Sequence, residues 1–495
     1  MHFLYTAEVL FNSFDYLLFL PVVALAYWLS PPKWRQLLLV LASYYFYMHA
    51  FKIYGLLLFG LTAFNYAFGL ALSRATGAKR LLLIAGITFN LGMLALFKYT
   101  NLLLSSLNET LDHLGGWFPL MSLKSTGIHD LPIILPLGIS FFVFEFIHYL
   151  TDVSKGSKPV KNPLRFALFA SFFPSQIAGP IKRYQDFDKQ LDKPAQANTE
   201  QIYSGLWLIA QGLFKKVALG DNLAPIAQAG FSAIPTLSVG DAWLAILAFA
   251  FQIYYDFSGY TDIGRGSAML FGYSLPENFN MPYIALSLKE FWHRWHISLS
   301  TWLRDYLYIP LGGSRGVESR TLCNLFVTML LGGLWHGASW TFLIWGAFHG
   351  AGLALNRIWE AFLKRNPALD KLTATLPGKV VSYLVTMVAV LCGWVFFYAK
   401  TLPDALTFIA TMFGLRAGQG ENMVSHLVTT STLLPAAALY ITLVACRFAA
   451  RHKLADLQMP SPARLSLQTA ALTIVLVLTM ELAPRVLQPF IYFQF

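Results

Sequence analysis

The sequence predicts an all-α protein that crosses a membrane many times, and three observations support this fold class. Of its 495 residues, 56% are hydrophobic and only 12% are charged, whereas a soluble domain carries about 25% charged residues. Apolar segments long enough to span a bilayer recur along the chain. Basic residues gather in the short loops between these segments, as the positive-inside rule describes.

Hydropathy predicts about ten to twelve membrane crossings. The clear candidates cover residues 16–30, 36–51, 53–72, 81–97, 131–150, 241–256, 379–398, 432–446 and 465–483. Shorter or interrupted candidates cover residues 166–180, 203–219, 321–336 and 341–357. The first 15 residues contain no Lys or Arg, so the first apolar segment lacks the basic region of a signal peptide and is expected to be retained.

The distribution of basic residues predicts the orientation of these crossings. The first, third and fifth loops are richer in Lys and Arg than their neighbours, and so are residues 357–379 and 447–464. All of these are expected in the cytoplasm, which leaves both termini outside. Residues 166–180 are short, contain Pro174 and Gly179, and have basic flanks. They are predicted to enter and leave the membrane on the cytoplasmic side, buried in protein.

The composition also excludes several classes of protein. Loop Lys and Arg residues account for the net charge of +11, and no nucleic-acid-binding module accompanies them, so nucleic acid is not an expected partner. Cys323, Cys392 and Cys446 lie far apart with no C-x-x-C, which disfavours disulfides and a cysteine zinc site. The longest predicted external loop, residues 98–130, is too short to form a catalytic domain.

Two segments match the E-x-x-H spacing of di-iron carboxylate proteins, Glu145 with His148 and Glu290 with His293. His293 and His296 also have an i, i+3 ligand spacing. A di-iron site needs a further Glu from each of two other helices, and the remaining apolar segments offer no good pair. No metal is therefore expected.

His336 is the first candidate for chemistry, because an ionisable group at membrane depth is costly and marks a functional site by default. Gly332, Gly333 and Gly337 remove side-chain bulk around it, and Trp335 and Trp340 supply flat apolar walls. A neutral imidazole in such a pocket can accept the proton of an attacking hydroxyl. The alternative is a structural histidine hydrogen-bonded between helices that pack through glycine. At its helix end, His336 is expected to lie on the outer side of the membrane.

His296 is the second candidate and lies where charged and aromatic residues alternate. Residues 289–305 are amphipathic and are expected to form an interfacial helix. A surface anchor with an aromatic belt is the alternative, and from the local sequence alone it is the better one.

Two further segments carry unusual residues. Asp256 and Asp262 follow an apolar segment and are flanked by Tyr and Ser, so they can orient a histidine or hold a polar substrate. A structural role, in helix capping or in pairing with Arg265, is favoured over this. The chain given ends in the aromatic segment 490–495, whose alternatives are docking onto the protein and anchoring at the membrane interface.

The sequence resembles the membrane-bound O-acyltransferase family, and specifically its bacterial alginate O-acetylation branch. The likeness covers nearly the whole chain and rests on segments in a fixed order. These are Pro136–Phe141, Gly179–Pro180, Phe214–Val217, Asp256–Asp262, Glu277–Phe279, Glu290–Trp292, Arg294–Ser300, Thr301–Leu307, Leu311–Gly313, Asn324–Phe326 and Leu334–Gly337.

The resemblance implies one integral membrane domain over residues 1–495, with a core at about 131–357 and an extracytoplasmic tail at 484–495. It implies a helical bundle with a central tunnel and with re-entrant and interfacial helices. The implied reaction moves an acetyl group from cytoplasmic acetyl-CoA to hydroxyls of an exported polysaccharide, such as alginate, cellulose or a peptidoglycan-like polymer. Transfer is direct or through a periplasmic esterase-like (SGNH) partner. The implied location is the bacterial inner membrane, among membrane lipids.

The resemblance also assigns roles to residues. His336 matches the family's catalytic histidine, and His296 matches its second active-site position. The tail resembles an F-x-Y-x-x-F motif of the D-alanylation branch, which makes Tyr492 a candidate acyl relay. Further substrate-binding candidates are Trp335, Asp256, Asp262, Asn278 and Arg304. His293 departs from the expected Arg or Asn and is either a neutral substitution or a further proton carrier.

A transporter or flippase is the alternative from another class, because multi-pass proteins with buried ionisable residues often move solutes. Against it, the sequence has no visible inverted repeat, and its ionisable residues concentrate in one stretch. A second alternative is acylation of a lipid or a protein. Release of CoA thiol from acetyl-CoA separates an acyltransferase from a transporter.

Overall fold

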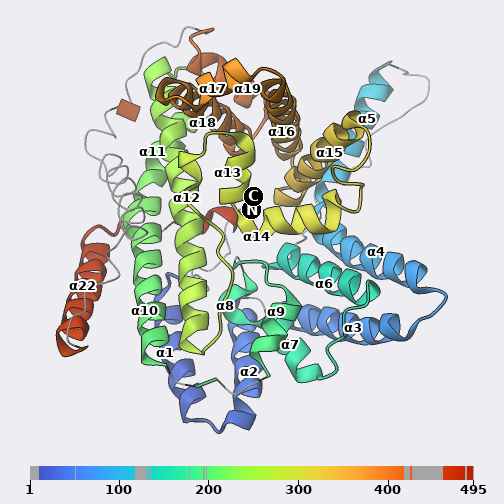
Figure 1. Ribbon diagram of the computed structural model, residues 1–495, viewed down its shortest axis with the longest axis vertical. Helices are drawn as coiled ribbons and strands as arrows, with labels where there is room; N and C mark the ends of the chain where they lie inside the picture. The colour runs from blue at the N-terminus through green and yellow to red at the C-terminus, as the bar shows by residue number, and fades with distance from the viewer. Residues whose placement is uncertain are drawn as a thin grey trace. The chain divides into compact units, whose positions relative to one another are not determined.

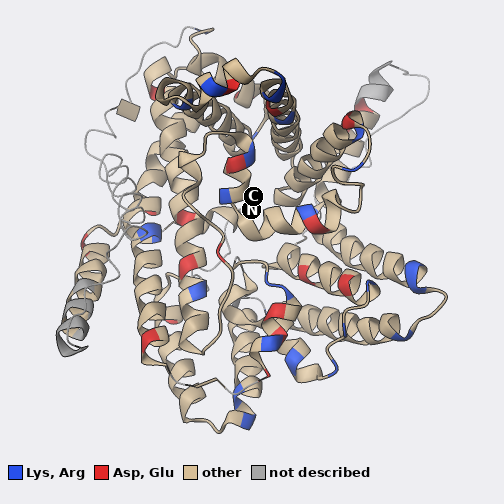
Figure 2. Ribbon diagram, viewed as in Figure 1, with Lys and Arg blue, Asp and Glu red and all other residues tan. Residues whose placement is uncertain are grey.

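The computed structural model describes residues 11–50, 52–117, 131, 133, 135–177, 179–192, 195–196, 198–416, 424–425, 461–484 and 488–493. The regular secondary structure of these residues is helical (Figure 1), which confirms the all-α prediction. Charged residues are sparse along the helices (Figure 2), as expected of an integral membrane protein. The described part of the chain divides into two compact units.

Three of the described helices are long and apolar enough to cross a membrane. They are α3 (Tyr54–Arg74), α4 (Lys79–Lys98) and α18 (Leu376–Tyr398). The total of ten to twelve crossings stays a prediction, and its candidate at 432–446 lies outside the described residues.

The first unit contains residues 25–195 and 334–339. After α2 (Pro32–Ala50), α3 and α4 come α5 (Thr100–Trp117), α6 (Ile139–Ser154), α7 (Pro163–Ser171), α8 (Phe173–Gln176) and α9 (Tyr184–Gln190). Helix α6 packs on α3 and α4, while α7 packs on α2 and α3. The buried core of this unit is strongly aromatic, with Tyr149 and Phe169 among its fully buried side chains.

The expected loop at 98–130 is wrong over its first half, because α5 occupies Thr100–Trp117. The signal was present in the sequence: Leu104, Leu107, Leu111 and Leu114 recur at intervals of three or four residues, the spacing of one helical face. Ser, Thr and Asn between them lowered the hydropathy and hid the period.

The segment predicted to be re-entrant consists of two short helices, α7 and α8, separated at Phe172. Asn162 caps α7, since its Oδ1 accepts hydrogen bonds from the N–H groups of Leu164 (2.9 Å) and Arg165 (3.3 Å). The helices are interrupted at Phe172 (φ −55°, ψ 105°), and Pro174 lies in the first turn of α8, where proline is tolerated. Entry and exit on one side of a membrane stays a prediction.

The second unit contains residues 7–24, 196–333 and 340–495. Helix α1 (Phe14–Leu29) begins in this unit and ends in the first. Helices α10 (Thr199–Leu213) and α11 (Asp221–Ser232) are joined by the π-helical turn η3 (Phe214–Gly220), and all three run beside α12 (Val239–Leu270) (Figure 1). Two glycine pairs, seven residues apart on each helix, let the backbones meet. A Cβ added at Gly212 would lie 2.6 Å from the carbonyl oxygen of Gly259, and one at Gly266 would lie 2.5 Å from that of Gly205.

Helix α12 is longer than predicted. The expected span 241–256 ends at Asp256, but α12 is one helix of 32 residues. Asp256 and Asp262 therefore lie within it, 2% and 8% exposed, and neither caps an end. Both carboxylates therefore need charged or hydrogen-bonding partners inside the protein, because an unpaired buried carboxylate is strongly unfavourable.

The predicted interfacial helix 289–305 is also wrong as a single element. It is divided into α13 (Leu288–Arg294) and α14 (Ile297–Leu303), followed by the π-helical turn η5 (Arg304–Tyr308). Trp292, Trp295 and Trp302 are buried, so they belong to the core of the unit and do not form a surface belt. The 3₁₀ turn η4 (Pro282–Ile284) precedes them.

The remaining helices are α15 (Glu318–His336), α16 (Trp340–Arg365), α17 (Pro367–Ala374), α18, α19 (Leu402–Met412), α22 (Ser461–Glu481) and the 3₁₀ turn η7 (Ile491–Phe493). His336 is the last residue of α15, so the predicted helix end and tight turn are confirmed. Helix α22 packs on α10 and η3, and η7 packs on α12.

Candidate functional site

His336 is held by its backbone at the end of α15. The ammonium group of Lys98, the last residue of α4, donates hydrogen bonds to the carbonyl oxygens of Trp335 and of His336, the latter at 3.0 Å. The hydroxyl of Tyr99 donates to the carbonyl of Leu334 at 2.6 Å. The last carbonyls of a helix lack partners in the helix itself, and a cation there also complements the helix dipole. Lys98 and Tyr99 therefore fix the end of α15 and the start of the His336 side chain.

Trp335 is braced by α6. Its ring stacks on that of Phe144, with centroids 5.2 Å apart and an interplanar angle of 26°, and lies edge-on to Phe141 at 5.4 Å. The centroid of the His336 ring lies 5.0 Å from that of Trp335, and His336 is only 6% exposed. The imidazole thus lies against the braced ring of Trp335, whereas Trp340, the other predicted wall, is 57% exposed.

His296 lies at the break between α13 and α14 in a left-handed backbone conformation, with φ 42° and ψ 55°. Such a conformation costs about 1–3 kcal/mol in a non-glycine residue and persists only where its surroundings impose it. Here Asn278 imposes it. Its backbone carbonyl accepts from the N–H of Ile297 at 2.9 Å, and its Oδ1 accepts from the N–H and hydroxyl of Ser298 at 3.2 and 2.6 Å.

These hydrogen bonds shape the turn that carries His296 and give Asn278 a structural role. Its expected role in binding substrate stays a prediction. The His296 side chain is fully buried, and its ring lies edge-on to Phe257 of α12, with centroids 4.7 Å apart. Helix α12 and the segment around Asn278 together hold the imidazole of His296 in the buried interior of the second unit.

The tail at 488–493 docks in the same unit. Phe490 is fully buried and stacks on Tyr260 at 4.3 Å. The ring of Tyr492 lies 4.7 Å from Phe257, so Phe257 contacts both Tyr492 and His296. The predicted contribution of Phe493 and Phe495 lies outside the described side chains. His336 belongs to the first unit, while His296 and Tyr492 belong to the second; a cavity shared by the two histidines stays a prediction.

The other predicted binding residues have partners within the protein. Asp256 pairs with Lys216 at 2.7 Å, and Asp262 pairs with Lys215 at 2.5 Å and, as expected, with Arg265 at 3.6 Å. Arg304 pairs with Asp305 at 2.7 Å, and its side chain is 57% exposed. These contacts favour the structural alternative for the two aspartates. Lys98 and Lys216 were missed, although a lysine inside or beside an apolar segment is itself a signal.

The glutamates of the two E-x-x-H segments form ion pairs. Glu145 forms a buried ion pair with Lys182 at 2.8 Å, and Glu290 pairs with Arg294 at 2.7 Å. Among the residues that the structure describes, no group of three or more His, Cys, Asp or Glu side chains is placed to hold a metal.

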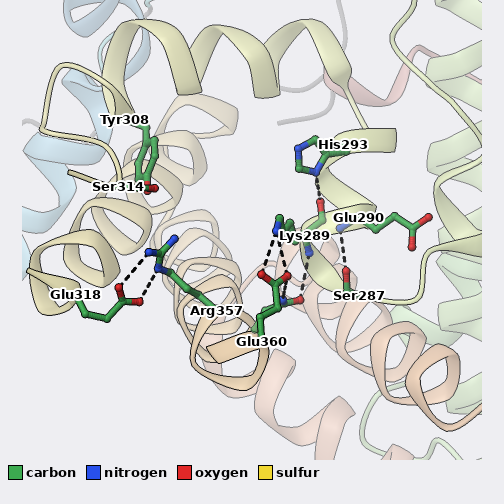
Figure 3. Close-up of polar contacts among 10 residues, drawn as sticks. Ser287, Lys289, Glu290, His293, Tyr308, Ser314, Glu318, Arg357 and Glu360 are labelled. Atoms are coloured by element: carbon green, nitrogen blue, oxygen red, sulfur yellow. Dashed lines mark hydrogen bonds and ion pairs between the residues drawn. The ribbon is translucent and has the colours of Figure 1, made fainter. Parts of the chain in front are cut away.

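A surface network joins α13, α15 and α16 (Figure 3). Lys289 pairs with Glu360 at 3.0 Å, and Arg357 pairs with Glu318 at 2.5 Å. The Arg357 hydrogen bond holds the pKa of Glu318 below its usual range. His293 donates from Nδ1 to the carbonyl of Lys289 at 2.6 Å and is exposed. His293 thus lies in this network on the surface, apart from the buried His296 turn.

Fold and residues together define a multi-pass, all-α membrane protein with buried imidazoles at helix ends. The model of MBOAT, the membrane-bound O-acyltransferase family, matches residues 158–397. The chain is 43% identical to the "Probable alginate O-acetylase AlgI" of Pseudomonas aeruginosa over 81% of this chain and 74% of that protein. It is 38% identical to the protein of that name from Pseudomonas putida, over 97% and 98%.

A third relative, the "Peptidoglycan O-acetyltransferase" of Helicobacter pylori, is 39% identical over 80% of this chain and 78% of that protein. The chain belongs to the membrane-bound O-acyltransferase family. It is a membrane-embedded O-acyltransferase, which removes the transporter alternative.

Replacing Lys98 by Met is expected to slow acyl transfer about tenfold, because the end of α15 loses its charged hydrogen-bond donor while the apolar stem is kept. Acyl transfer is measured in membranes containing equal amounts of protein. Lys79→Met, at the opposite end of α4, is the control and is expected to keep the wild-type rate. A Lys98→Met variant as active as wild type would show that the cap does not position His336.

His296→Gly separates the imidazole from the strained backbone, because glycine adopts the left-handed conformation without strain. It is expected to keep thermal stability better than His296→Ala. Both variants are expected to lose acyl transfer about 10²-fold, the lower end for a proton-transfer group. Rates and melting temperatures are compared for the purified proteins. Wild-type transfer by the glycine variant would leave His296 with a purely structural role.

Proposed function

We propose that this enzyme moves acetyl groups from cytoplasmic acetyl-CoA, across a bacterial inner membrane, to hydroxyls of an exported polysaccharide. The observation that carries the proposal is the similarity to an alginate O-acetylase along 97% of this chain. Alginate is the proposed acceptor, and the Helicobacter pylori relative supports peptidoglycan as the second candidate. A periplasmic esterase-like (SGNH) protein is the proposed partner for delivery, and both termini are proposed to lie outside.

His336 is proposed to be the general base. A neutral imidazole accepts the proton of a hydroxyl as its oxygen attacks the thioester carbonyl. The new C–O bond forms as the C–S bond breaks, and the departing sulfur takes the proton to give CoA thiol. Burial against the braced Trp335 supports this role by keeping water from competing for the acetyl group. His296 is proposed to act beside it in the same tunnel.

Tyr492 is proposed to relay the acetyl group. Its hydroxyl would attack the thioester first, forming an aryl acetate and CoA thiol. A hydroxyl of the polymer or of the partner would then attack the aryl acetate and regenerate Tyr492. A phenol has a pKa of about 10, far below that of a sugar hydroxyl, so phenolate leaves readily and the acetyl group stays activated. Two steps let a large polymer be acetylated without entering the membrane.

Replacing His336 by Ala is expected to lower acetyl transfer about 10²–10⁴-fold, the usual effect of removing a general base. The assay follows CoA thiol released from acetyl-CoA by purified protein and acetyl groups on polymer in cells. Helix content and membrane abundance of the variant serve as controls. Undiminished transfer by a well-folded variant would overturn the assignment.

Tyr492→Phe is expected to lower acetylation of the polymer to a small residual rate, because the variant loses the nucleophilic hydroxyl while it keeps the aromatic contacts of the ring. Wild-type enzyme trapped with labelled acetyl-CoA, in the absence of acceptor, is expected to carry label on the peptide containing Tyr492. Mass spectrometry of the C-terminal peptide measures this. Unchanged polymer acetylation by Tyr492→Phe would reduce the tail to an anchor.

A further inference from the structure

Three charged side chains form a buried cluster in the second unit. Lys216 of η3, Asp221 of α11 and Asp256 of α12 are 0%, 1% and 2% exposed. The Lys216 ammonium lies 2.6 Å from Oδ1 of Asp221 and 2.7 Å from Oδ1 of Asp256. One cation thus bridges two carboxylates, and the carboxylates outnumber the cation.

The C-terminal tail supplies two further hydrogen bonds to this cluster. The N–H of Ile491 donates to Oδ2 of Asp256 at 2.7 Å, and the Lys216 ammonium donates to the carbonyl of Gln488 at 3.0 Å. A buried carboxylate requires more donors than one shared lysine provides. The backbone of the tail therefore completes the cluster, and the cluster binds the tail at both ends of a four-residue stretch, 488–491.

We propose that Lys216, Asp221 and Asp256 form a latch that holds the C-terminal tail and thereby positions Tyr492 against Phe257. This inference rests on the proposed relay role of Tyr492 and adds three positioning residues to it. The three side chains contact the main chain of the tail, and Tyr492 follows the latched residue Ile491 directly. A short segment with one 3₁₀ turn cannot hold a fixed conformation by itself, so the buried Phe490 and the latch must fix its conformation.

A purely structural role, in joining η3 to α12, is the competing explanation. The neighbouring pair provides a matched comparison, because Lys215 of η3 also binds an aspartate of α12, Asp262, at 2.5 Å. No hydrogen bond or ion pair joins Lys215 or Asp262 to the described residues of the tail. Breaking either pair weakens the contact between η3 and α12, but only the Lys216 cluster touches the tail.

The direct test is hydrogen exchange of the C-terminal peptide in the full-length protein in lipid nanodiscs. Ile491→Pro removes the N–H that Asp256 binds and leaves the cluster intact, and proline is tolerated at the start of a helical turn. Ile491→Ala loses a similar side chain and keeps the donor. The remaining tail amides are expected to exchange about tenfold faster in Ile491→Pro than in Ile491→Ala, the effect of one hydrogen bond to a charged group.

Lys216→Met and Asp256→Asn are expected to raise tail exchange to a similar degree, while peptides of α10 and α12 stay protected. Lys215→Met is expected to leave tail exchange at the wild-type level. If Ile491→Pro does not fold, Asp256→Asn, which keeps the shape of the side chain, carries the same test. Tail exchange that stays at the wild-type level in these folded variants would overturn the latch.

A double-mutant cycle links the latch to catalysis. Ile491→Pro is expected to slow acetyl transfer in the wild-type background and to have no further effect in the Tyr492→Phe background. A loss of equal size in both backgrounds would show that the cluster acts only on stability. If Tyr492→Phe is fully active while the latch variants still free the tail, the relay fails and the latch stands.

Discussion

The cost of placing charge away from water constrains this structure more than any other interaction. A buried ion is tolerated only with a partner and further hydrogen bonds, and the partners here come from different segments. Glu145 of α6 binds Lys182, which follows α8, and Lys216 of η3 binds Asp256 of α12. In a lipid-facing bundle, apolar contacts between helices discriminate poorly, because lipid is as apolar as leucine. Ion pairs between buried charged residues therefore help to determine which helix faces pack together within each unit.

The same constraint explains how a histidine can be kept at a helix end inside the first unit. The last carbonyl groups of α15 need hydrogen-bond donors. The ammonium group of Lys98 donates to two of them, so it positions His336 through the backbone. The charge that caps the helix is thereby used to fix the backbone from which the catalytic candidate projects. The proposed chemistry belongs to His336, while the placement of His336 depends on residues more than two hundred positions earlier in the chain.

Much of the fold could be predicted from sequence, because apolar segments and helical periods are local signals. The helices around 16–30, 53–72, 81–97 and 379–398 and the turn after His336 were found in this way. The breaks and pairings were not. The left-handed turn at His296 depends on Asn278, which follows a different helix, and no periodicity in 289–305 reports it. The amphipathic pattern there is continuous although the helix is not, since a tertiary hydrogen-bond set overrides local propensity.

The C-terminal tail also shows what the sequence alone cannot predict. Its aromatic residues suggested docking, but what holds it is a contact between Asp256 and a backbone N–H 235 residues further on. Backbone groups have no sequence signature, so such a contact is invisible until the chain is folded. A bond to a backbone N–H depends on the position of the residue in the chain and not on its side chain. Because Asp256 binds the amide of Ile491, the next residue, Tyr492, lies beside Phe257. A shift of one residue would place another side chain there. The proposed relay through Tyr492 requires this kind of register control, because a tail free to slide would present the hydroxyl only part of the time.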